Sequence, residues 1–367
     1  MQLAELTTLR VGGPAERFVE ATAVEQLVDE VLEAERLGEP WFVLGGGSNV
    51  LVGDEGIDGL VVRIATRGIE RLPDVPGSAR PVRLRVQAGE PWDALVAHTV
   101  ENGWAGIEAL SGIPGSTGAA PIQNIGAYGQ DLAESLVSVE LLDVESGERR
   151  AVPAPALELG YRSSALKSGW RAVVLSVELA LEHSEASLSR PIAYAQLAEA
   201  LGVAVGERAP LTATRAAVLA LRASKGMVLD ENDRQSVSAG SFFTNPIVSE
   251  SFALRMPAEA PRWPQQPEPV AVAVPLGHEP APPPERVEGT VKLSAAWLIE
   301  HAGIARGFAL PGSGASVSTK HTLALTNASG RATAAEVAEL ARYIQTRVRD
   351  TYGVVLHPEP VFVGIAL

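Results

Sequence analysis

Three consecutive glycines interrupt an apolar stretch near the N-terminus, and they restrict the path of the chain more than any other feature. Residues 41–44 (Trp-Phe-Val-Leu) and 50–52 (Val-Leu-Val) have the composition of short buried strands. The Gly-Gly-Gly-Ser-Asn segment between them, at 45–49, allows positive φ angles and lets backbone N–H groups approach a ligand closely. It differs from the GxGxxG dinucleotide fingerprint, because no helix pattern follows it. The segment is therefore either a ligand-binding loop or a tight hairpin.

A second glycine-rich segment, residues 112–129, is longer and nearly uncharged. Small residues and two prolines dominate it. We expect a loop without secondary structure of its own, and a loop of this length is usually functional. Its amides and hydroxyls would bind a diphosphate, and its apolar members would line a flat ring system. The alternative is a purely structural loop.

The pattern around the first glycine segment predicts a small α/β lobe. Residues 22–25 have the Thr-x-x-Glu spacing of a capping box, and the apolar Leu27, Val28 and Val31 follow on one helix face. Residues 60–64 (Leu-Val-Val-Arg-Ile) are a further apolar strand.

A second lobe follows a polar stretch at 72–79. Alternating apolar residues predict strands at 82–86, 136–142 and 173–181. Between the first two strands, Pro91 occupies a first-turn position and Gly103 ends a helix. The apolar stripe of that helix consists of Trp92, Leu95, Val96 and Val100. A further helix at 212–224 closes this part of the chain.

A third region starts near Lys225. It contains ten prolines within residues 257–284, a density that excludes a helix or a central strand there and predicts an extended surface insertion without chemistry. Further on, we expect a helix at 293–302, a strand at 323–325, and strands at 354–356 and 361–365. Residues 333–336 form a second capping box. The helix it opens has an apolar stripe of Val337, Leu340, Ile344 and Val348.

The bulk properties exclude several classes of function. The net charge is −14 and lysine and arginine do not cluster, which disfavours nucleic acid and anionic membrane surfaces as partners. The chain has no cysteine, so disulfides, thiolate catalysis and cysteine metal sites are excluded, and we expect no metal. No signal-peptide pattern and no apolar run of about 20 residues is present. We expect a cytoplasmic protein.

Ser241 is the most suggestive side chain for chemistry. It lies between Gly240 and the aromatic pair Phe242–Phe243, with Asn245 four residues on. A hydroxyl held against aromatic walls is poorly hydrated, so it can stay neutral, keep one rotamer and donate a proton. The alternative is an ordinary buried strand end.

Taken together, the motifs resemble the UDP-N-acetylenolpyruvoylglucosamine reductase (MurB) family of flavoenzymes nearly end to end. The match includes Val-Gly-Gly-Pro-Ala at 11–15, Leu-Gly-Gly-Gly-Ser-Asn-Val-Leu at 44–51, Gly-Ile-Pro-Gly at 112–115, Gln-Asn-Ile-Gly-Ala-Tyr-Gly at 123–129, Gly-Tyr-Arg-Ser-Ser at 160–164, Ala-Gly-Ser-Phe-Phe at 239–243 and Pro-Glu at 358–359. Each motif is weak alone, but their order is highly specific.

The resemblance implies an α+β protein with an FAD-binding fold of the vanillyl-alcohol-oxidase (PCMH) type in two lobes and a separate α+β substrate-binding domain. On this reading residues 1–68 with 353–367 form lobe 1, residues 69–224 form lobe 2, and residues 225–352 form the substrate-binding domain. FAD would be held non-covalently by the two glycine-rich loops. The residues expected to hold it are Gly45, Gly46, Gly47, Ser48, Asn49, Gly115, Ser116, Thr117, Gly118, Asn124, Gly126, Ala127 and Tyr128.

The resemblance also implies the residues of the active site. Arg162, Ser241 and Glu359 match the family's catalytic arginine, serine and glutamate. Four further residues match substrate-binding positions: Tyr194, after the Arg-Pro pair of family members with a substrate-capping tyrosine; Lys225 and Asn245, which would hold the UDP diphosphate; and His321, a polar contact to the nucleotide. The spacer between Lys225 and Ser241 is longer than in the best-known members.

The implied reaction is the reduction of UDP-N-acetylglucosamine enolpyruvate to UDP-N-acetylmuramate for peptidoglycan synthesis, with NADPH as co-substrate. NADPH would reduce the flavin and leave, and the flavin would pass the hydride to the alkene. Arg162 would grip the substrate carboxylate, a protonated Glu359 would assist it, and Ser241 would donate the proton. We expect a monomer acting on small molecules.

Two other functions fit the loops. The first is an FAD oxidase of alcohols or sugars, many of which bind the flavin covalently through histidine or cysteine. Neither glycine-rich loop contains histidine, and the chain lacks cysteine. Flavin that stays with acid-precipitated protein would favour this oxidase. The second is a non-catalytic nucleotide-binding module, which would bind flavin without bleaching under NADPH.

Overall fold

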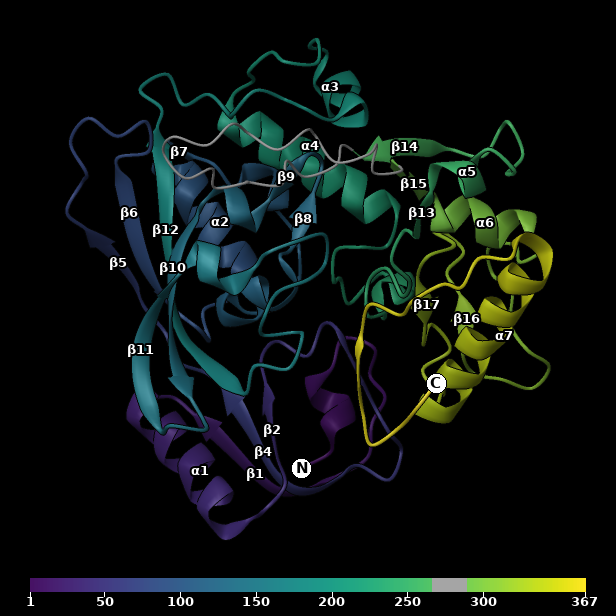
Figure 1. The fold of residues 1–367 in the computed structure, drawn as a ribbon, viewed down its shortest axis with the longest axis horizontal. Helices are drawn as coiled ribbons and strands as arrows, with labels where there is room; N and C mark the ends of the chain where they lie inside the picture. The colour runs from purple at the N-terminus through teal and green to yellow at the C-terminus, as the bar shows by residue number, and fades with distance from the viewer. Residues whose placement is uncertain (266–288) are drawn as a thin grey trace, which may run out of the picture.

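The computed structural model describes residues 1–265 and 289–367, and it confirms the α+β class. Figure 1 shows an N-terminal lobe in purple, a second lobe around a large sheet in blue and teal, and a third region in green and yellow beside them. Of the proline-rich segment predicted at 257–284, only residues 257–265 belong to the described residues, and the remainder lies outside them. Among the described residues, no helix is both long and apolar enough to cross a membrane.

The elements of the N-terminal lobe are η1 (Leu3–Leu6), β1 (Ala15–Ala21), α1 (Val24–Leu37), β2 (Trp41–Leu44), β3 (Val50–Val52) and β4 (Ile57–Ile64). Strands β1, β4 and β2 form a parallel sheet in that order, with β4 in the centre. The predicted apolar strand at 60–64 lies within β4. Leu60 and Val62 face the large core that includes α1, and Val61 faces a smaller core on the other side. Burial on both faces explains the continuous apolar run.

The capping box predicted at residues 22–25 is wrong, although the helix predicted to follow it is present as α1. Ala23 is the N-cap residue of α1 and makes no side-chain cap. Instead, the N–H of Thr22 donates to Oε1 of Gln26 at 3.2 Å. The Thr-x-x-Glu spacing lies one residue too early to cap a helix that begins at Val24.

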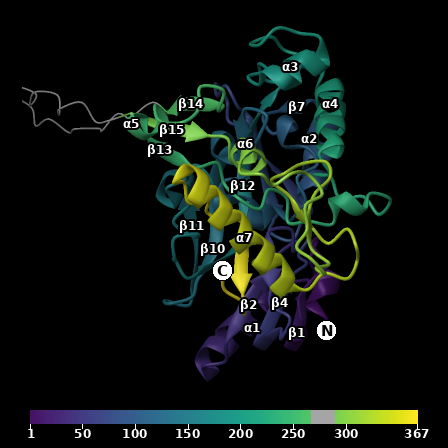
Figure 2. The same ribbon diagram turned by 90° about the vertical axis from the view of Figure 1, so that its right-hand side faces the viewer.

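The hairpin reading of residues 45–49 is also wrong. Strand β2 pairs with β4, whereas β3 pairs in parallel with β18 (Val361–Val363). The glycine segment therefore leads the chain from one sheet to another. This pairing brings the C-terminal segment to the N-terminal lobe, and Figures 1 and 2 show the chain end beside α7.

The elements of the second lobe are β5 (Ile69–Leu72), β6 (Val82–Gln87), α2 (Trp92–Glu101), β7 (Trp104–Ala105), η2 (Glu108–Leu110), η3 (Thr117–Gln123), β8 (Gly126–Ala127), β9 (Gln130–Asp131), η4 (Leu132–Glu134), β10 (Leu136–Asp143), β11 (Glu148–Pro153), η5 (Ala154–Leu157), β12 (Ala172–His183), α3 (Ala195–Leu201) and α4 (Leu211–Ser224). An antiparallel sheet runs β11-β10-β12-β6-β5, and β7 pairs with β12. The predicted alternation holds, because Val82, Leu84 and Val86 are fully buried. The predicted stripe of α2 is buried as well.

The elements of the third region are η6 (Arg234–Ser236), β13 (Ile247–Ser249), α5 (Glu250–Ala253), β14 (Arg262–Gln265), β15 (Thr290–Leu293), α6 (Ala295–His301), β16 (Ser316–Val317), β17 (Leu325–Thr326) and α7 (Ala334–Tyr352). Strands β13, β15 and β14 form a small antiparallel sheet. Pro264 lies in β14 at the edge of this sheet, where a missing N–H donor is tolerated. Among residues 257–265, the proline-rich composition is therefore compatible with an edge strand, which the predicted extended insertion did not include.

Three elements predicted for this region differ from the structure. The helix predicted at 293–302 begins two residues later, because Leu293 ends β15 and Ser294 caps α6 through its hydroxyl. The strand predicted at 323–325 covers only the two residues of β17, and residues 354–356 are not a strand. Val354 and Leu356 are buried in the core of the third region, outside any sheet. Their apolar character therefore reflects core packing and not a strand.

The second capping box is confirmed and has a further function. Thr333 and Glu336 cap α7 reciprocally. The same helix end also receives Asp54 of the N-terminal lobe, whose carboxylate accepts from the N–H groups of Ala334 at 2.7 Å and Ala335 at 2.9 Å. A carboxylate at a helix N-terminus is favourable. Asp54 therefore ties the third region to the first.

Candidate functional site

A cavity of about 540 Å³ lies where the three regions meet. Residues 41–50 and 113–128 contribute much of its lining, and the other contributions come from distant segments. Ten of the lining residues from these other segments are Arg162, Lys167, Tyr194, Arg222, Lys225, Met227, Gly240, Ser241, His321 and Glu359. Both glycine-rich segments thus belong to one site, as expected for a shared ligand.

The two glycine-rich segments approach each other so closely that side chains cannot fit between them. A Cβ atom on Gly46 would lie 2.5 Å from Cα of Gly115, and one on Gly45 would lie 2.6 Å from Oγ of Ser116. Gly47 has φ +62°. The Ser48 hydroxyl donates to the carbonyl of Pro114 at 2.9 Å and fastens one segment to the other. The result is a cradle of exposed backbone, the kind of surface that holds phosphate.

The longer segment has secondary structure of its own, contrary to expectation. Residues 117–123 form the 3-10 helix η3, and β8 follows. Two of the predicted cofactor residues fasten this segment to neighbouring parts of the protein and do not line the cavity. The Thr117 hydroxyl donates to Glu90 O at 2.9 Å, and the Asn124 side chain bridges Gly160 O and the N–H of Ala133. The other eleven predicted cofactor residues all line it.

Arg162 and Glu359 meet in the cavity although 197 positions separate their numbers (359 minus 162). Nε of Arg162 lies 3.4 Å from Oε1 of Glu359. The guanidinium is held by the carbonyls of Asn124 at 3.3 Å and Gly126 at 2.7 Å, and the Arg162 backbone has φ +54°. Its position is therefore fixed by the longer glycine-rich segment.

Glu359 is shielded from solvent, and its side chain is only 14 % exposed. Burial raises the pKa of this carboxyl above its ordinary value, while Arg162, Lys167 and Gln123 oppose that shift. Burial outweighs these opposing groups, since the carboxylate loses more solvation here than two partly exposed cations restore. The raised pKa favours a neutral acid that can donate a hydrogen bond.

Ser241 reaches the same cavity from the third region. The N–H of Glu359 donates to Phe242 O at 2.9 Å, which brings the serine and glutamate segments side by side. Phe242 and Phe243 are fully buried in the core of the third region, edge to face with ring centroids 5.3 Å apart. The aromatic pair thus anchors the backbone in the core and does not line the cavity, so it is no wall around the ligand space.

Three of the four predicted substrate residues line the cavity. Tyr194 lies edge to face with Tyr128, with ring centroids 5.6 Å apart, and is 45 % exposed. Nζ of Lys225 lies 5.5 Å from the centre of the Tyr128 ring and donates to Gln196 Oε1 at 2.9 Å. Burial and the charge of Lys225 lower the pKa of His321 to about 4. His321 is therefore neutral near pH 7 and available as a hydrogen-bonding group.

Asn245 is the fourth, and it does not line the cavity. Its Oδ1 accepts from the N–H of Ala295 at 3.0 Å, at the start of α6. It also hydrogen-bonds Tyr161, which opposes the effect of burial that raises the pKa of that tyrosine. In this structure Asn245 thus holds the third region against the segment that carries Arg162.

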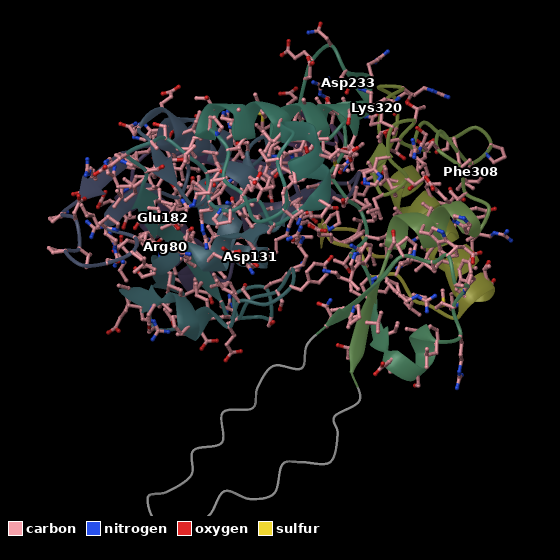
Figure 3. The ribbon with its side chains drawn as sticks, turned by 90° about the horizontal axis from the view of Figure 1, so that it is seen from above. Arg80, Asp131, Glu182, Asp233, Phe308 and Lys320 are labelled. Carbon is pink, nitrogen blue, oxygen red and sulfur yellow. The ribbon has the colours of Figure 1, made fainter. Side chains whose placement is uncertain are left out.

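The longer spacer after Lys225 is fastened to the loop that carries His321. Nζ of Lys320 lies 2.8 Å from Oδ2 of Asp233, a pair labelled in Figure 3. The N–H of Thr319 donates to Gln235 Oε1 at 2.9 Å. These contacts position His321 on the cavity wall.

Sequence reasoning missed Arg222. It lies on the last turn of α4, lines the cavity, and donates from Nη2 to Met227 O at 2.9 Å. Its Nε is buried and has no hydrogen-bonding partner among the described residues. A buried guanidinium N–H without a partner is costly, so this atom fits a ligand oxygen. The only signal in the sequence is a second cation three residues before Lys225.

The cavity is positively charged within an acidic protein. Arg162, Lys167, Arg222 and Lys225 line it, and Glu359 is the one carboxylate among the described lining residues. The whole chain has a net charge of −14. Such local focusing favours anionic ligands over cationic ones. Among the described residues, no group of three or more histidine, aspartate or glutamate side chains could hold a metal ion.

Comparisons with known proteins agree with this geometry. Residues 15–152 match the FAD binding domain family, and residues 232–363 match the family "UDP-N-acetylenolpyruvoylglucosamine reductase, C-terminal domain". The chain is 58 % identical over 376 residues to the UDP-N-acetylenolpyruvoylglucosamine reductase of Leifsonia xyli subsp. xyli, covering 100 % of this chain and 98 % of the relative. It is 50 % identical to that of Saccharopolyspora erythraea, covering 100 % and 95 %.

A solved structure has the same fold. The reductase from Thermus caldophilus superposes with a TM-score of 0.63 at 24 % identity, over 99 % of this chain and 97 % of that one.

Proposed function

Because the chain belongs to the UDP-N-acetylenolpyruvoylglucosamine reductase family, it is an FAD-dependent oxidoreductase that reduces UDP-N-acetylglucosamine enolpyruvate with NADPH, and we propose that Arg162, Ser241 and Glu359 carry out its chemistry. One observation supports the assignment above all others. Three side chains from distant parts of the chain reach one cavity that is also lined by both glycine-rich segments.

The residues present fit FAD. Residues 45–48 and 115–116 pack too closely for side chains on the glycines, so the cradle presents backbone N–H groups. Such groups suit a diphosphate. Apolar residues of the longer segment, such as Ile122 and Ala127, line the cavity and suit a flat ring. When bound, FAD supplies the transfer of a hydride from NADPH to the substrate alkene.

Arg162 binds and polarises the enolpyruvyl carboxylate. Its guanidinium is permanently charged, and two backbone carbonyls fix its direction. Negative charge grows on this carboxylate and the adjacent carbon as the alkene is reduced, so a fixed cation stabilises the transition state. Glu359 assists as a neutral acid, which its raised pKa favours, because an ionised carboxylate would repel the same charge.

Ser241 donates the proton to the carbon that carries this charge. A serine is a weak acid in water, but a carbanion next to a carboxylate is basic enough to accept its proton. The fully buried Phe242 and Phe243 hold the serine backbone in place.

Lys225, Tyr194 and His321 bind the nucleotide. Lys225, next to Tyr128 and Gln196, is placed for a diphosphate oxygen, and Tyr194 covers it from the exposed side. The neutral His321 offers a hydrogen bond to the nucleotide. Asn245 contributes by holding α6 and Tyr161 in place.

The decisive experiment separates the two half-reactions without oxygen. NADPH should bleach the flavin of the purified protein, and UDP-N-acetylglucosamine enolpyruvate should then restore its absorbance. Ser241→Ala should leave the first step nearly unchanged and slow the second by several orders of magnitude. Equal slowing of both steps would remove Ser241 as the acid.

A cytoplasmic location and a monomeric state belong to the same proposal. The reaction consumes NADPH and a nucleotide sugar, both of which are cytoplasmic metabolites, and its product is a peptidoglycan precursor. Light scattering of the purified protein would test the monomer.

A further inference from the structure

Gln123 links three polar side chains behind the reacting groups. It is the last residue of η3, and its side chain lines the cavity. Its Oε1 accepts from Nδ2 of Asn49 at 2.8 Å and from Nζ of Lys167 at 3.3 Å. Its Nε2 donates to Oε1 of Glu359 at 3.1 Å. The amide therefore connects the first glycine-rich segment to the carboxyl group of the C-terminal segment.

Lys167 and Asn49 together determine which way this amide points. An ammonium group has only donors, so the oxygen of Gln123 must face it and the NH₂ group must face Glu359. Asn49 supports the same orientation, because its Nδ2 also donates to the backbone carbonyl of Glu359 at 3.3 Å and so presents its NH₂ group to Gln123. Nζ of Lys167 also donates to the backbone carbonyl of Arg162 at 3.3 Å, which ties the lysine to the arginine segment.

The orientation of Gln123 makes the two oxygens of Glu359 unequal. Nε2 of Gln123 and Nε of Arg162 both approach Oε1, at 3.1 Å and 3.4 Å. A proton on Oε1 would face the N–H group of Gln123 and the positive charge of Arg162, whereas a proton on Oε2 would face neither. In the neutral carboxyl group of Glu359, Oε1 is therefore the acceptor and Oε2 carries the hydrogen and is the donor.

We propose that Gln123, oriented by Lys167, is a positioning residue that keeps Oε1 of Glu359 an acceptor and its acidic hydrogen on Oε2. This inference rests on the proposed function, in which Glu359 acts as a neutral acid. With the hydrogen confined to Oε2, Glu359 can donate to the substrate while Arg162 keeps its contact with Oε1. Without Gln123 the hydrogen exchanges between the oxygens, and part of the enzyme holds the donor in the wrong place.

The charged and titratable groups that face Glu359 are Arg162 and Lys167, with Tyr161 at a greater distance. Removing Lys167 or the Gln123 amide takes away a group that favours the ionised carboxylate, so either change raises the pKa of Glu359 further. A merely structural role for Gln123 would not move this ionisation.

The test compares Gln123→Leu, Lys167→Met and Lys167→Arg in the flavin-loaded protein, using both half-reactions. We expect Gln123→Leu to slow substrate reduction by about tenfold more than it slows flavin reduction by NADPH. Lys167→Met should show the same selective effect, but smaller. Lys167→Arg should restore the wild-type ratio, since arginine also has only donors. In both slowed variants, the alkaline limb of the pH profile for substrate reduction should move to higher pH.

A double-mutant cycle shows whether Gln123 acts through Glu359. In a Glu359→Gln background, which has no carboxyl hydrogen to place, Gln123→Leu should cause no further selective loss. Additive losses, or an unmoved pH profile, would overturn the inference and leave the assignment of Glu359 intact. If Glu359→Gln alone keeps the wild-type rate, the assignment of Glu359 itself fails. Flavin content and thermal unfolding of each variant separate these results from misfolding.

Discussion

The two halves of the cavity lining are built in opposite ways. The glycine-rich half, residues 45–49, 113–116 and 118, contains no charged residue, and its shape comes from backbone atoms in close approach. The ionic half consists of Arg162, Lys167, Arg222, Lys225 and Glu359, and its properties come from side chains on separate segments. The glycine-rich half binds a ligand through the shape of its backbone. The ionic half supplies the charged groups that bind the reacting part of the ligand and act on it. A change in the first half should therefore affect occupancy, and a change in the second should affect rate.

Gly46→Val should have the largest effect. Its Cβ would lie 2.5 Å from Cα of Gly115, and backbone cannot move aside as a flexible side chain can. We expect loss of bound FAD and a stability loss of about 1–3 kcal/mol or more. Flavin absorbance per protein and chemical denaturation measure the two effects.

Gly38→Ala is the matched control for that change. Gly38 has φ +68° and open space around it, so alanine costs about 1–2 kcal/mol of backbone strain without touching the cradle. It should keep its FAD. If both variants lose FAD equally, the close approach of the two segments is not what holds the cofactor.

Arg162→Ala should have the next largest effect, and on rate. Substrate reduction by the reduced flavin should slow by about 10²–10³-fold, because a fixed donor to the developing charge is lost. Rapid mixing without oxygen measures this step. Arg162→Lys keeps the charge but not the forked geometry, so it should recover only part of the rate. Flavin reduction slowed as much as substrate reduction would show that Arg162 mainly supports the cofactor segment.

Asp233→Asn should have a modest effect on binding. The change removes the charge that pairs with Lys320 but keeps an oxygen to cap η6, so the loop that carries His321 loosens without unfolding. A partly exposed pair contributes little, so we expect the KM for the UDP substrate to rise by about two- to fivefold with kcat nearly unchanged. Lys320→Met should behave alike, and the double variant should be no worse than either single one.

Glu359→Gln should have the smallest effect on stability, with a characteristic pH dependence. The pKa of Glu359 is raised on folding, so its contribution is full at acidic pH and is lost as the pH rises through the folded-state pKa. Glutamine cannot ionise, so the Tm of the variant relative to wild type should rise with pH. Thermal unfolding over a pH series checks this, and a constant difference would contradict a raised pKa.

Local structure followed local sequence rules closely. The strands at 41–44 and 50–52, the stripe of α2 and the capping box at Thr333 are all present as predicted. The failures share one cause. Residues 354–356 are apolar but form no strand, since the core that buries them is assembled by tertiary packing. Residues 22–25 have the spacing of a capping box, but the helix begins at Val24, so Ala23 and not Thr22 is the N-cap residue.

The candidate site divides along the same line. Arg162, Ser241 and Glu359 could be predicted because they lie in motifs that follow the family's order. Arg222 and Lys167 lie in no motif that would indicate a role in the site. Their importance depends on which way a side chain points and on how much solvent it keeps, and neither property is encoded within a few neighbouring residues.

The sequence by itself determined where the backbone must come close to something, because only glycine allows such an approach and its positions can be read directly. It also determined, through the order of its motifs, which family the chain belongs to. Only the tertiary structure decided that β3 pairs with β18 and that Glu359 lies against Gln123 and Arg162. The physical reason is range: propensity and capping act over a few residues, whereas burial and charge pairing act between segments that meet only in the folded protein.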